Sequence, residues 1–437
     1  MMLRKRTLAI CAVTLGSALV LSGCSAAGGD ASSDSTTVEI LGNFTGPAAT
    51  AFQAEMDKWG ESSGVTVKYS GSSNFQQAVI TNVTAGNVPD IAIYPQPGVL
   101  KQQIGSLVPL DELVDVKSVT ADMAKGLPEI AKVDGKTYGL PYSINVKSLV
   151  WFNPAAFKKN DYTVPTTDEE MTALSKKIIS DGAGYPWCVG IESASSTGWA
   201  ATDWLEEYVL RYGGLDTYND WIDHKVLFDS PVVKQAAEKF ESIALSPGAV
   251  NGGGAAIAAT NFGTASNPLF VDGKENGQCF LMRQGTFIQD SFPDTVKAEI
   301  AKGDYSNIDA FALPTPSGAT SGAMGGGDLV GAFNKDDATK SVVNYLVGKD
   351  FGTNGYVSQA IFLSPHNDFD KTLYKSKFQQ TAAGIVQDAT VFGFDASDQM
   401  PGAVGAGTEW TNLTDWVSGR QTLDAALKNI DASWPNS

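Results

Sequence analysis

The chain has 437 residues, 43% of them hydrophobic, and a formal net charge of −17 at pH 7. This length is enough for two domains of ordinary size, each with its own core. The negative charge makes nucleic acid and anionic lipid poor partners, so we expect neither.

The N-terminus has the pattern of an export signal. A basic stretch, Met1–Arg6, precedes an apolar run, Thr7–Leu21. The run is shorter than the roughly 18–20 residues that span a bilayer, which disfavours an uncleaved membrane helix. Leu21-Ser22-Gly23-Cys24 resembles a bacterial lipobox and stands where a plain signal peptide has its small-residue cleavage site. The resemblance implies a lipoprotein signal peptide at residues 1–23 and a lipid-bearing Cys24.

Residues 24–37 are mostly small and polar, as in a flexible spacer. Removal of the signal leaves 28 basic residues (31 minus Arg4, Lys5 and Arg6) against 48 acidic ones, a balance of −20. We therefore expect an acidic body on the extracellular face of the cytoplasmic membrane, attached by its lipid alone.

Four cysteines reduce to two in this body, because Cys11 lies in the signal and Cys24 carries lipid. Cys188 and Cys279 remain. In an oxidising compartment an even count favours a disulfide, and two buried free thiols are the alternative. No metal site is expected, since neither cysteine has a second Cys or His within ligand spacing.

Strands and helices alternate at the start of the body. Residue patterns predict strands at Val38–Leu41, Val65–Tyr69 and Pro89–Tyr94, with helices at 48–59 and Phe75–Thr84 between them. This alternation is typical of βαβ units in a largely parallel sheet.

Ligands of such sheets bind beyond the carboxyl ends of the strands. Asn43 and Phe44 follow the first predicted strand, and Tyr94–Pro97, which includes Gln96, follows the third. Topology therefore places both segments at a predicted ligand site.

The rest of the chain mixes helical segments with glycine-rich turns, from Trp151 to about Tyr305. A short strand is predicted at Phe311–Leu313 and a glycine-rich turn at Gly325–Gly327. Helical patterns continue to the end, where Thr422 is expected to cap a last helix that begins at Leu423.

Four segments in this order resemble the substrate-binding lipoproteins of carbohydrate ABC importers, a family that includes maltodextrin-binding protein. They are residues 86–94, Gly135–Tyr142, Ser148–Pro154 and Gly419–Leu427. A narrower similarity to the alpha-glucoside-binding branch rests on Pro186–Gly190, Gly198–Trp204, Gly277–Gln284, Gly325–Asp328, Phe362–Pro365 and Met400–Gly407.

The resemblance implies an α/β, two-lobed periplasmic-binding-protein-like fold of type II, with the ligand in a cleft between the lobes and three hinge crossings. Residues 38–146 plus 308–352 are expected to form lobe one, and residues 147–307 plus 353–437 lobe two. It also implies a monomer without cofactor that takes an oligosaccharide and delivers it to the permease of an importer.

A sugar needs aromatic platforms for its C–H faces and amides or carboxylates for its hydroxyls. For several candidates a structural role stays open: a core position for Tyr94, a turn for Asn43, the helix dipole for Asp203 and a salt bridge for Arg283. The predicted ligand-contacting residues are Asn43, Phe44, Tyr94, Gln96, Asn145, Trp151, Trp199, Asp203, Arg283, Phe287, Gly327, Asp328 and Trp410.

Two enzyme classes compete with this interpretation. Gly60–Gly64 matches the G-x-S-x-G pattern of serine hydrolases, but a predicted helix precedes it and a strand follows, the reverse of a nucleophile elbow. A glycoside hydrolase needs only two suitably spaced carboxylates, and 48 acidic residues are available. The match along the whole body to a non-catalytic family favours a binding protein over both.

Overall fold

The computed structural model describes residues 36–72, 74–358 and 362–435. The predicted signal peptide, Cys24 and most of the spacer lie outside the described residues. In the described part of the chain, no helix is both long enough and apolar enough to cross a membrane.

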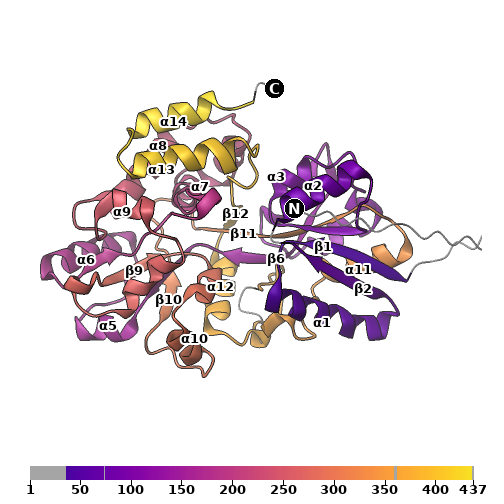
Figure 1. The fold of residues 1–437 in the computed structure, drawn as a ribbon, viewed down its shortest axis with the longest axis horizontal. Coiled ribbons are helices and arrows are strands. Elements are labelled where there is room, and N and C mark those ends of the chain that lie inside the picture. The colour runs from indigo at the N-terminus through magenta and orange to yellow at the C-terminus, as the bar shows by residue number, and fades with distance from the viewer. Residues whose placement is uncertain (1–35, 73, 359–361, 436–437) are drawn as a thin grey trace, which may run out of the picture. The chain divides into compact units, whose positions relative to one another are not determined.

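A six-stranded mixed sheet gathers the predicted βαβ units with later parts of the chain (Figure 1). Its central strand order is β12-β11-β3-β1-β2, and β6 also pairs with β11. The pairs β1–β2, β1–β3 and β11–β12 are parallel, whereas β11 runs antiparallel to β3 and β6. The strands are β1 (Thr37–Gly42), β2 (Thr66–Gly71), β3 (Ile91–Tyr94), β6 (Leu140–Val146), β11 (Gly322–Ala332) and β12 (Val391–Phe394).

The predicted first two helices are confirmed beside this sheet. In α1 (Gly46–Ser63) the buried side chains include Phe52 and Met56, one turn apart, and Gly64 ends the helix in the left-handed conformation that glycine adopts at little cost. The other helices of this part are α2 (Phe75–Ala85), α3 (Pro97–Lys101), α4 (Val116–Val119), α11 (Asp337–Leu346) and α12 (Lys377–Asp388).

A second sheet has four strands in the order β10-β7-β9-β8. Its strands are β7 (Leu149–Phe152), β8 (Tyr185–Trp187), β9 (Cys279–Arg283) and β10 (Asp309–Ala312), the last of which overlaps the predicted strand at 311–313. A separate pair, β4 (Lys132–Val133) and β5 (Lys136–Thr137), forms a small hairpin.

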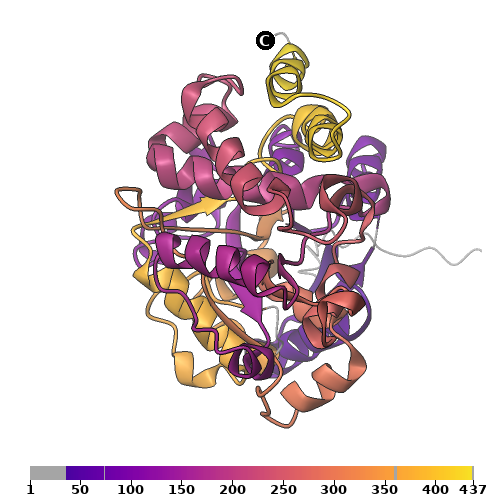
Figure 2. The same cartoon turned by 90° about the vertical axis from the view of Figure 1, so that its left-hand side faces the viewer.

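The remaining helices include the 24-residue α7 and the C-terminal pair α13 and α14, which pack against each other (Figure 2). The Thr422 side chain accepts a hydrogen bond from the Ala425 backbone N–H, so the predicted cap is confirmed. The helices are α5 (Pro154–Lys159), α6 (Asp168–Asp181), α7 (Trp199–Ile222), α8 (Pro231–Phe240), α9 (Gly253–Ala259), α10 (Asp294–Ile300), α13 (Trp410–Val417) and α14 (Leu423–Ala432).

The buried hydrophobic side chains form two clusters. The four-stranded sheet contributes to both, with Trp151 and Met282 in the first cluster and Val150 and Leu281 in the second. The chain leaves the six-stranded sheet through Lys147 and Ser148, returns from β10 to β11, and leaves again after β12 for α13. The larger sheet also draws on residues 391–394, which lie within the range predicted for lobe two. The lobe boundaries stay a prediction.

The predicted glycine-rich turn at Gly325–Gly327 is wrong, because these residues lie inside β11. A Cβ on Gly325 would come within 1.9 Å of the Asn145 carbonyl oxygen, and one on Gly327 within 2.4 Å of the Ser143 carbonyl oxygen. The glycines therefore serve the close approach of β6 rather than a change of chain direction.

The Cys188–Cys279 disulfide is formed, with the two Cα atoms 5.5 Å apart and a sequence separation of 91. It ties the segment after β8 to the start of β9. Both cysteines are buried, so the prediction of a disulfide is confirmed.

Candidate functional site

A buried ion-pair network lies where the chain passes between the two sheets. Lys147, directly after β6, places its Nζ 2.7 Å from Asp203 Oδ1 and 2.5 Å from Asp395 Oδ2. Asp203 comes from the first turns of α7, and Asp395 follows β12. Burial opposes the ionisation of Asp395, but the Lys147 charge and local hydrogen bonds outweigh it and lower the pKa of this carboxyl. The network thus joins three separate segments through one ammonium group.

The acidic side chains of α7 extend this network. Glu207 bonds Arg283 on β9 at 2.7 Å and Arg211 one turn along the helix at 2.8 Å. Glu206 accepts hydrogen bonds from the backbone N–H groups of Ala396 at 2.9 Å and Ser397 at 3.1 Å. Residues three and four positions apart share a helix face, so the sequence Asp-x-x-Glu-Glu directs all three acids into the interior.

Aromatic rings lie beside these charges. The ring centroid of Trp199 is 5.0 Å from that of Phe262 and 5.8 Å from that of Phe287, and Lys147 Nζ is 5.2 Å from the Trp199 centroid. Trp199 and Phe287 are half-buried, so part of each ring stays accessible.

Trp410 reaches the same place from the start of α13. Gly198, the cap of α7, has a φ of +116°, and a Cβ there would lie 2.4 Å from the Trp410 carbonyl oxygen. Only glycine tolerates both this backbone conformation and this contact. The structure thus brings together Trp199, Asp203, Arg283, Phe287 and Trp410 of the predicted set.

A second group of predicted residues lies on the six-stranded sheet. Asp328 on β11 has a side-chain hydrogen bond with Asn43, which follows β1, and burial raises the pKa of Asp328 to about 6. Phe44 stacks on Tyr69 with ring centroids 4.5 Å apart. Asn145 on β6 accepts a hydrogen bond from the Gly326 backbone N–H at 3.0 Å, beside Gly327.

The two groups are connected through a short stretch of β6, because Asn145 belongs to the second group and Lys147, two residues later, to the first. The Asp395 backbone N–H also donates a 2.7 Å hydrogen bond to the Gly325 carbonyl oxygen on β11. Ten of the thirteen predicted residues therefore fall into two connected groups.

Tyr94 and Trp151 instead occupy core positions, both with 0% exposure. The Tyr94 hydroxyl donates to Gln103 Oε1 at 2.8 Å, and Trp151 Nε1 donates to the Gln284 carbonyl oxygen at 2.8 Å. Neither ring presents a free face in this structure. Tyr94 thus takes the core alternative that the sequence left open.

Gln96 is half-buried at the N-cap of α3. Two residues later, the Gly98 backbone N–H donates to the Asp398 carbonyl oxygen at 3.0 Å. This contact brings the turn after β3 against the segment after β12, near the ion-pair network.

Several polar atoms in these groups, and in Glu409 directly before Trp410, are buried and have no hydrogen-bond partner among the described residues. They are Asn43 Oδ1, Asp203 Oδ2, Arg283 Nε, Trp410 Nε1 and both carboxylate oxygens of Glu409. Buried polar atoms are normally paired. A ligand that carries both donors and acceptors fits such a set.

Sequence reasoning missed Lys147, Glu206, Asp395 and Glu409. Lys147 and Asp395 are 248 positions apart, so no local motif joins them. The available signal was a lone lysine between two hydrophobic strand patterns, because a charge at such a position needs a buried partner.

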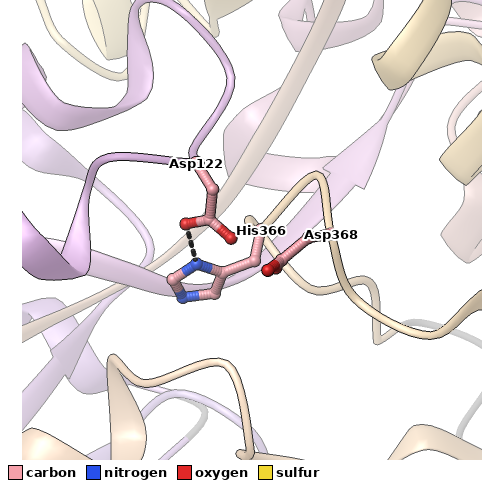
Figure 3. A group of neighbouring side chains, drawn as sticks. All are labelled: Asp122, His366 and Asp368. Atoms are coloured by element: carbon pink, nitrogen blue, oxygen red, sulfur yellow. Dashed lines mark hydrogen bonds and ion pairs between the residues drawn. The ribbon is translucent and has the colours of Figure 1, made fainter.

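The structure also gathers Asp122, His366 and Asp368, whose ligand-type atoms lie within 4.8 Å of one another (Figure 3). His366 Nδ1 lies 2.7 Å from Asp122 Oδ1, and its Nε2 lies 3.0 Å from the Val347 carbonyl oxygen. Both ring nitrogens thus have partners, and the Asn367 backbone N–H also donates to the Asp122 carbonyl oxygen at 3.0 Å. These hydrogen bonds join the segment around Asp122 to the segment around His366, which accounts for the group by a structural role.

Asp203, Glu206 and Asp395 form a second set of acids with comparable spacing. Here the ammonium group of Lys147 already supplies the positive charge between Asp203 and Asp395. The arrangement therefore accounts for these carboxylates without a metal ion.

The sequence profile of the bacterial extracellular solute-binding proteins matches residues 45–353, most of the chain. The chain belongs to this family. A solute-binding protein of Synechocystis sp., the osmoprotective compounds-binding protein GgtB, is 35% identical over 96% of this chain and 97% of its own length. The alpha-glucosides-binding periplasmic protein AglE of Rhizobium meliloti is 32% identical over 91% of this chain and 87% of its own.

Solved structures show the same type II solute-binding fold. The solute receptor AcbH, whose reported preference is for β-D-galactopyranose, superposes with a TM-score of 0.73 at 18% identity, over 91% of this chain and 98% of its own. Maltose-bound MalE3 of T. maritima gives 0.65 at 17% identity, over 91% and 98%. At these identities the likeness establishes the α/β, two-lobed architecture, as predicted.

Proposed function

We propose that this solute-binding protein captures an oligosaccharide, with alpha-glucosides such as maltose, trehalose, sucrose or isomaltose-type sugars as the first candidates, and delivers it to an ABC importer. The observation that carries the proposal is the similarity to AglE and GgtB along nearly the whole chain. The juxtaposition of half-buried aromatic rings with buried carboxylate and guanidinium groups and half-buried amide side chains supports it, because sugars need both kinds of contact.

The proposed binding surface uses both residue groups. The rings of Trp199, Phe287 and Trp410 supply faces for sugar C–H groups. The hydroxyls would be held by Asp203 and Arg283 from one group, and by Asn43, Asn145 and Asp328 from the other. Unpartnered buried atoms such as Asn43 Oδ1 and Trp410 Nε1 gain partners when a sugar binds.

Binding in this proposal is coupled to lobe closure. A sugar that contacts residues on both sheets stabilises the arrangement in which both contacts are made, and so shifts the population towards it. The closed form is the one that the permease would recognise. No step of this cycle cleaves the sugar.

Calorimetric titration of the body from residue 36 onward against maltose, trehalose, sucrose, isomaltose and cellobiose tests the proposal. We expect micromolar or tighter binding of at least one alpha-linked sugar, which is recovered intact. Release of monosaccharide would show a glycoside hydrolase instead, and absence of heat with every sugar would refute the proposed ligand class.

Matched tryptophan variants test the site. Trp199→Ala and Trp410→Ala should each weaken binding by about 30-fold, because buried tryptophans at binding sites often contribute 2 kcal/mol or more. Trp434→Ala is the control, since Trp434 stacks on His224 with centroids 4.2 Å apart and is outside both residue groups. Unchanged affinity in both site variants would remove these rings from the site.

We also propose that Cys24 anchors the protein by lipid to the extracellular face of the cytoplasmic membrane. The support is the lipobox-like sequence Leu21–Cys24. Metabolic labelling with an alkyne fatty acid should mark the full-length protein but not Cys24→Ser. Equal labelling of both would overturn the anchor.

A further inference from the structure

Glu409 is a fully buried acid with no hydrogen-bond partner in the part of the chain that the structure describes. It ends a π-helical turn, Val404–Glu409, just before α13, and its exposure is 0%. Neither carboxylate oxygen has a hydrogen-bond partner among the described residues. Extra-wide helical turns of this kind are frequent at functional sites, and a buried carboxyl group without a partner costs stability.

The charged groups around Glu409 do not stabilise its ionised carboxylate. Asp395 repels the ionised form, and Glu206 on α7 is close enough for the two acids to affect each other. Lys147 is already held between Asp203 and Asp395. Burial, with Asp395 as the second cause, raises the pKa of Glu409 well above its ordinary value. A neutral carboxyl group both donates and accepts hydrogen bonds.

Glu409 also adjoins the proposed sugar-binding surface. The next residue is Trp410, whose indole Nε1 is likewise buried and unpartnered. The Trp410 backbone touches Gly198, which directly precedes Trp199. Three buried polar atoms without a hydrogen-bond partner among the described residues thus belong to one proposed platform, Trp410, and to the residue directly before it.

We propose that Glu409 is a specificity-determining residue of the sugar site, whose carboxyl group exchanges hydrogen bonds with one hydroxyl or a neighbouring pair of hydroxyls of the ligand. The inference rests on the proposed function and extends it to a residue that sequence reasoning did not select. This contact selects for ligands that carry a hydroxyl at the contacted position, because an analogue without that hydroxyl leaves the buried carboxyl group unpaired.

A thermodynamic cycle between residue and ligand tests this inference. The probes are monodeoxy analogues of maltose, trehalose and sucrose, each hydroxyl in turn replaced by hydrogen, titrated against wild type, Glu409→Leu and Glu409→Gln. In wild type, loss of the contacted hydroxyl should weaken binding by about 10- to 100-fold. In Glu409→Leu, the parent sugar should bind about 10- to 100-fold more weakly, and loss of that same hydroxyl should cost no further affinity.

The outcomes are distinguishable. A coupling confined to one or two hydroxyl positions supports the contact, since a merely structural role would weaken all analogues alike. Wild-type affinity of Glu409→Leu, or a uniform loss with every analogue, overturns it. If Glu409→Leu melts below the assay temperature, Glu409→Gln carries the same cycle and must show reduced coupling at the same position. Failure of wild type to bind any parent sugar would remove the proposed function, and this inference with it.

Discussion

Replacement of Lys147 by methionine should destabilise the protein more than any change to its exposed ion pairs. Lys147 and Asp203 have side-chain exposures of 9% and 1%, and Asp395 has 5%. The variant leaves the buried Asp395 carboxylate without its cation, and leaves Asp203 with only Arg283, whose Nη1 lies 3.8 Å from Asp203 Oδ2. Removal of one partner from a buried ion pair costs about 3–5 kcal/mol.

This cost translates into a measurable change in melting temperature. With an unfolding entropy of about 2.1 cal/mol/K per residue and roughly 400 folded residues, the slope is about 0.8 kcal/mol per degree. The expected loss is therefore about 4–6 °C. Lys159→Met is the matched control, because Lys159 and Asp272 are 60% and 70% exposed, and such pairs contribute under about 1 kcal/mol.

Urea and thermal unfolding of both variants should be followed at several pH values. In wild type the pKa of Asp395 is lowered, so its contribution is present above the ordinary aspartate pKa and is lost as pH falls through the lowered value. Without Lys147 the buried acids favour protonation, and the deficit of Lys147→Met should widen as pH rises from 4 to 7. A deficit no larger than that of Lys159→Met would refute the reasoning.

Three further changes have expected outcomes. Reduction of the Cys188–Cys279 bond, or its replacement by two alanines, should cost about 4–5 kcal/mol for a loop of 91 residues, measured by urea unfolding with and without reductant; equal midpoints would contradict this. Burial raises the pKa of Asp328 to about 6, so the folded state binds the extra proton and Asp328 contributes a decline in stability as pH rises from about 4 to 6. Asp328→Asn should therefore show a smaller decline than wild type, whereas Asp294→Asn, at an exposed site, should match wild type; equal slopes in all three proteins would contradict this. Gly198→Ala should destabilise the protein and weaken sugar binding, because the new Cβ meets the Trp410 backbone. Gly384→Ala in α12 has nothing within 4 Å of the new Cβ and should stabilise the protein by about 0.5–1 kcal/mol. Calorimetric melting of the two variants checks the signs.

Local patterns predicted the elements that depend on near neighbours. The first three strands, the helices between them and the Thr422 cap follow from residue periodicity and capping chemistry, which operate over a few positions. Gly325–Gly327 was misjudged because the same glycines serve a turn or a close strand pairing, and β6, which requires them, lies about 180 positions earlier.

Members of the proposed site could be predicted where a side chain stands at a strand or helix end. Trp199 and Asp203 open α7, and Asn43 follows β1, so topology selected residues that the structure brings into the two groups of the proposed site. Tyr94 also ends a strand, but its hydroxyl finds Gln103 in the core, a contact that no strand pattern reveals. The Lys147 network depends on partners distant in sequence, and the burial of Glu409 depends on the packing around it, so only the folded arrangement identifies them.

The most direct test of the account is closure on a sugar. Small-angle scattering of the body from residue 36 onward should be recorded with and without saturating maltose, trehalose or sucrose, alongside the calorimetric titration. The account predicts binding of at least one of these sugars, a smaller radius of gyration on binding, and recovery of the sugar intact. Binding without any decrease would contradict the closure mechanism, and no binding to any of the three would contradict the proposed ligand class.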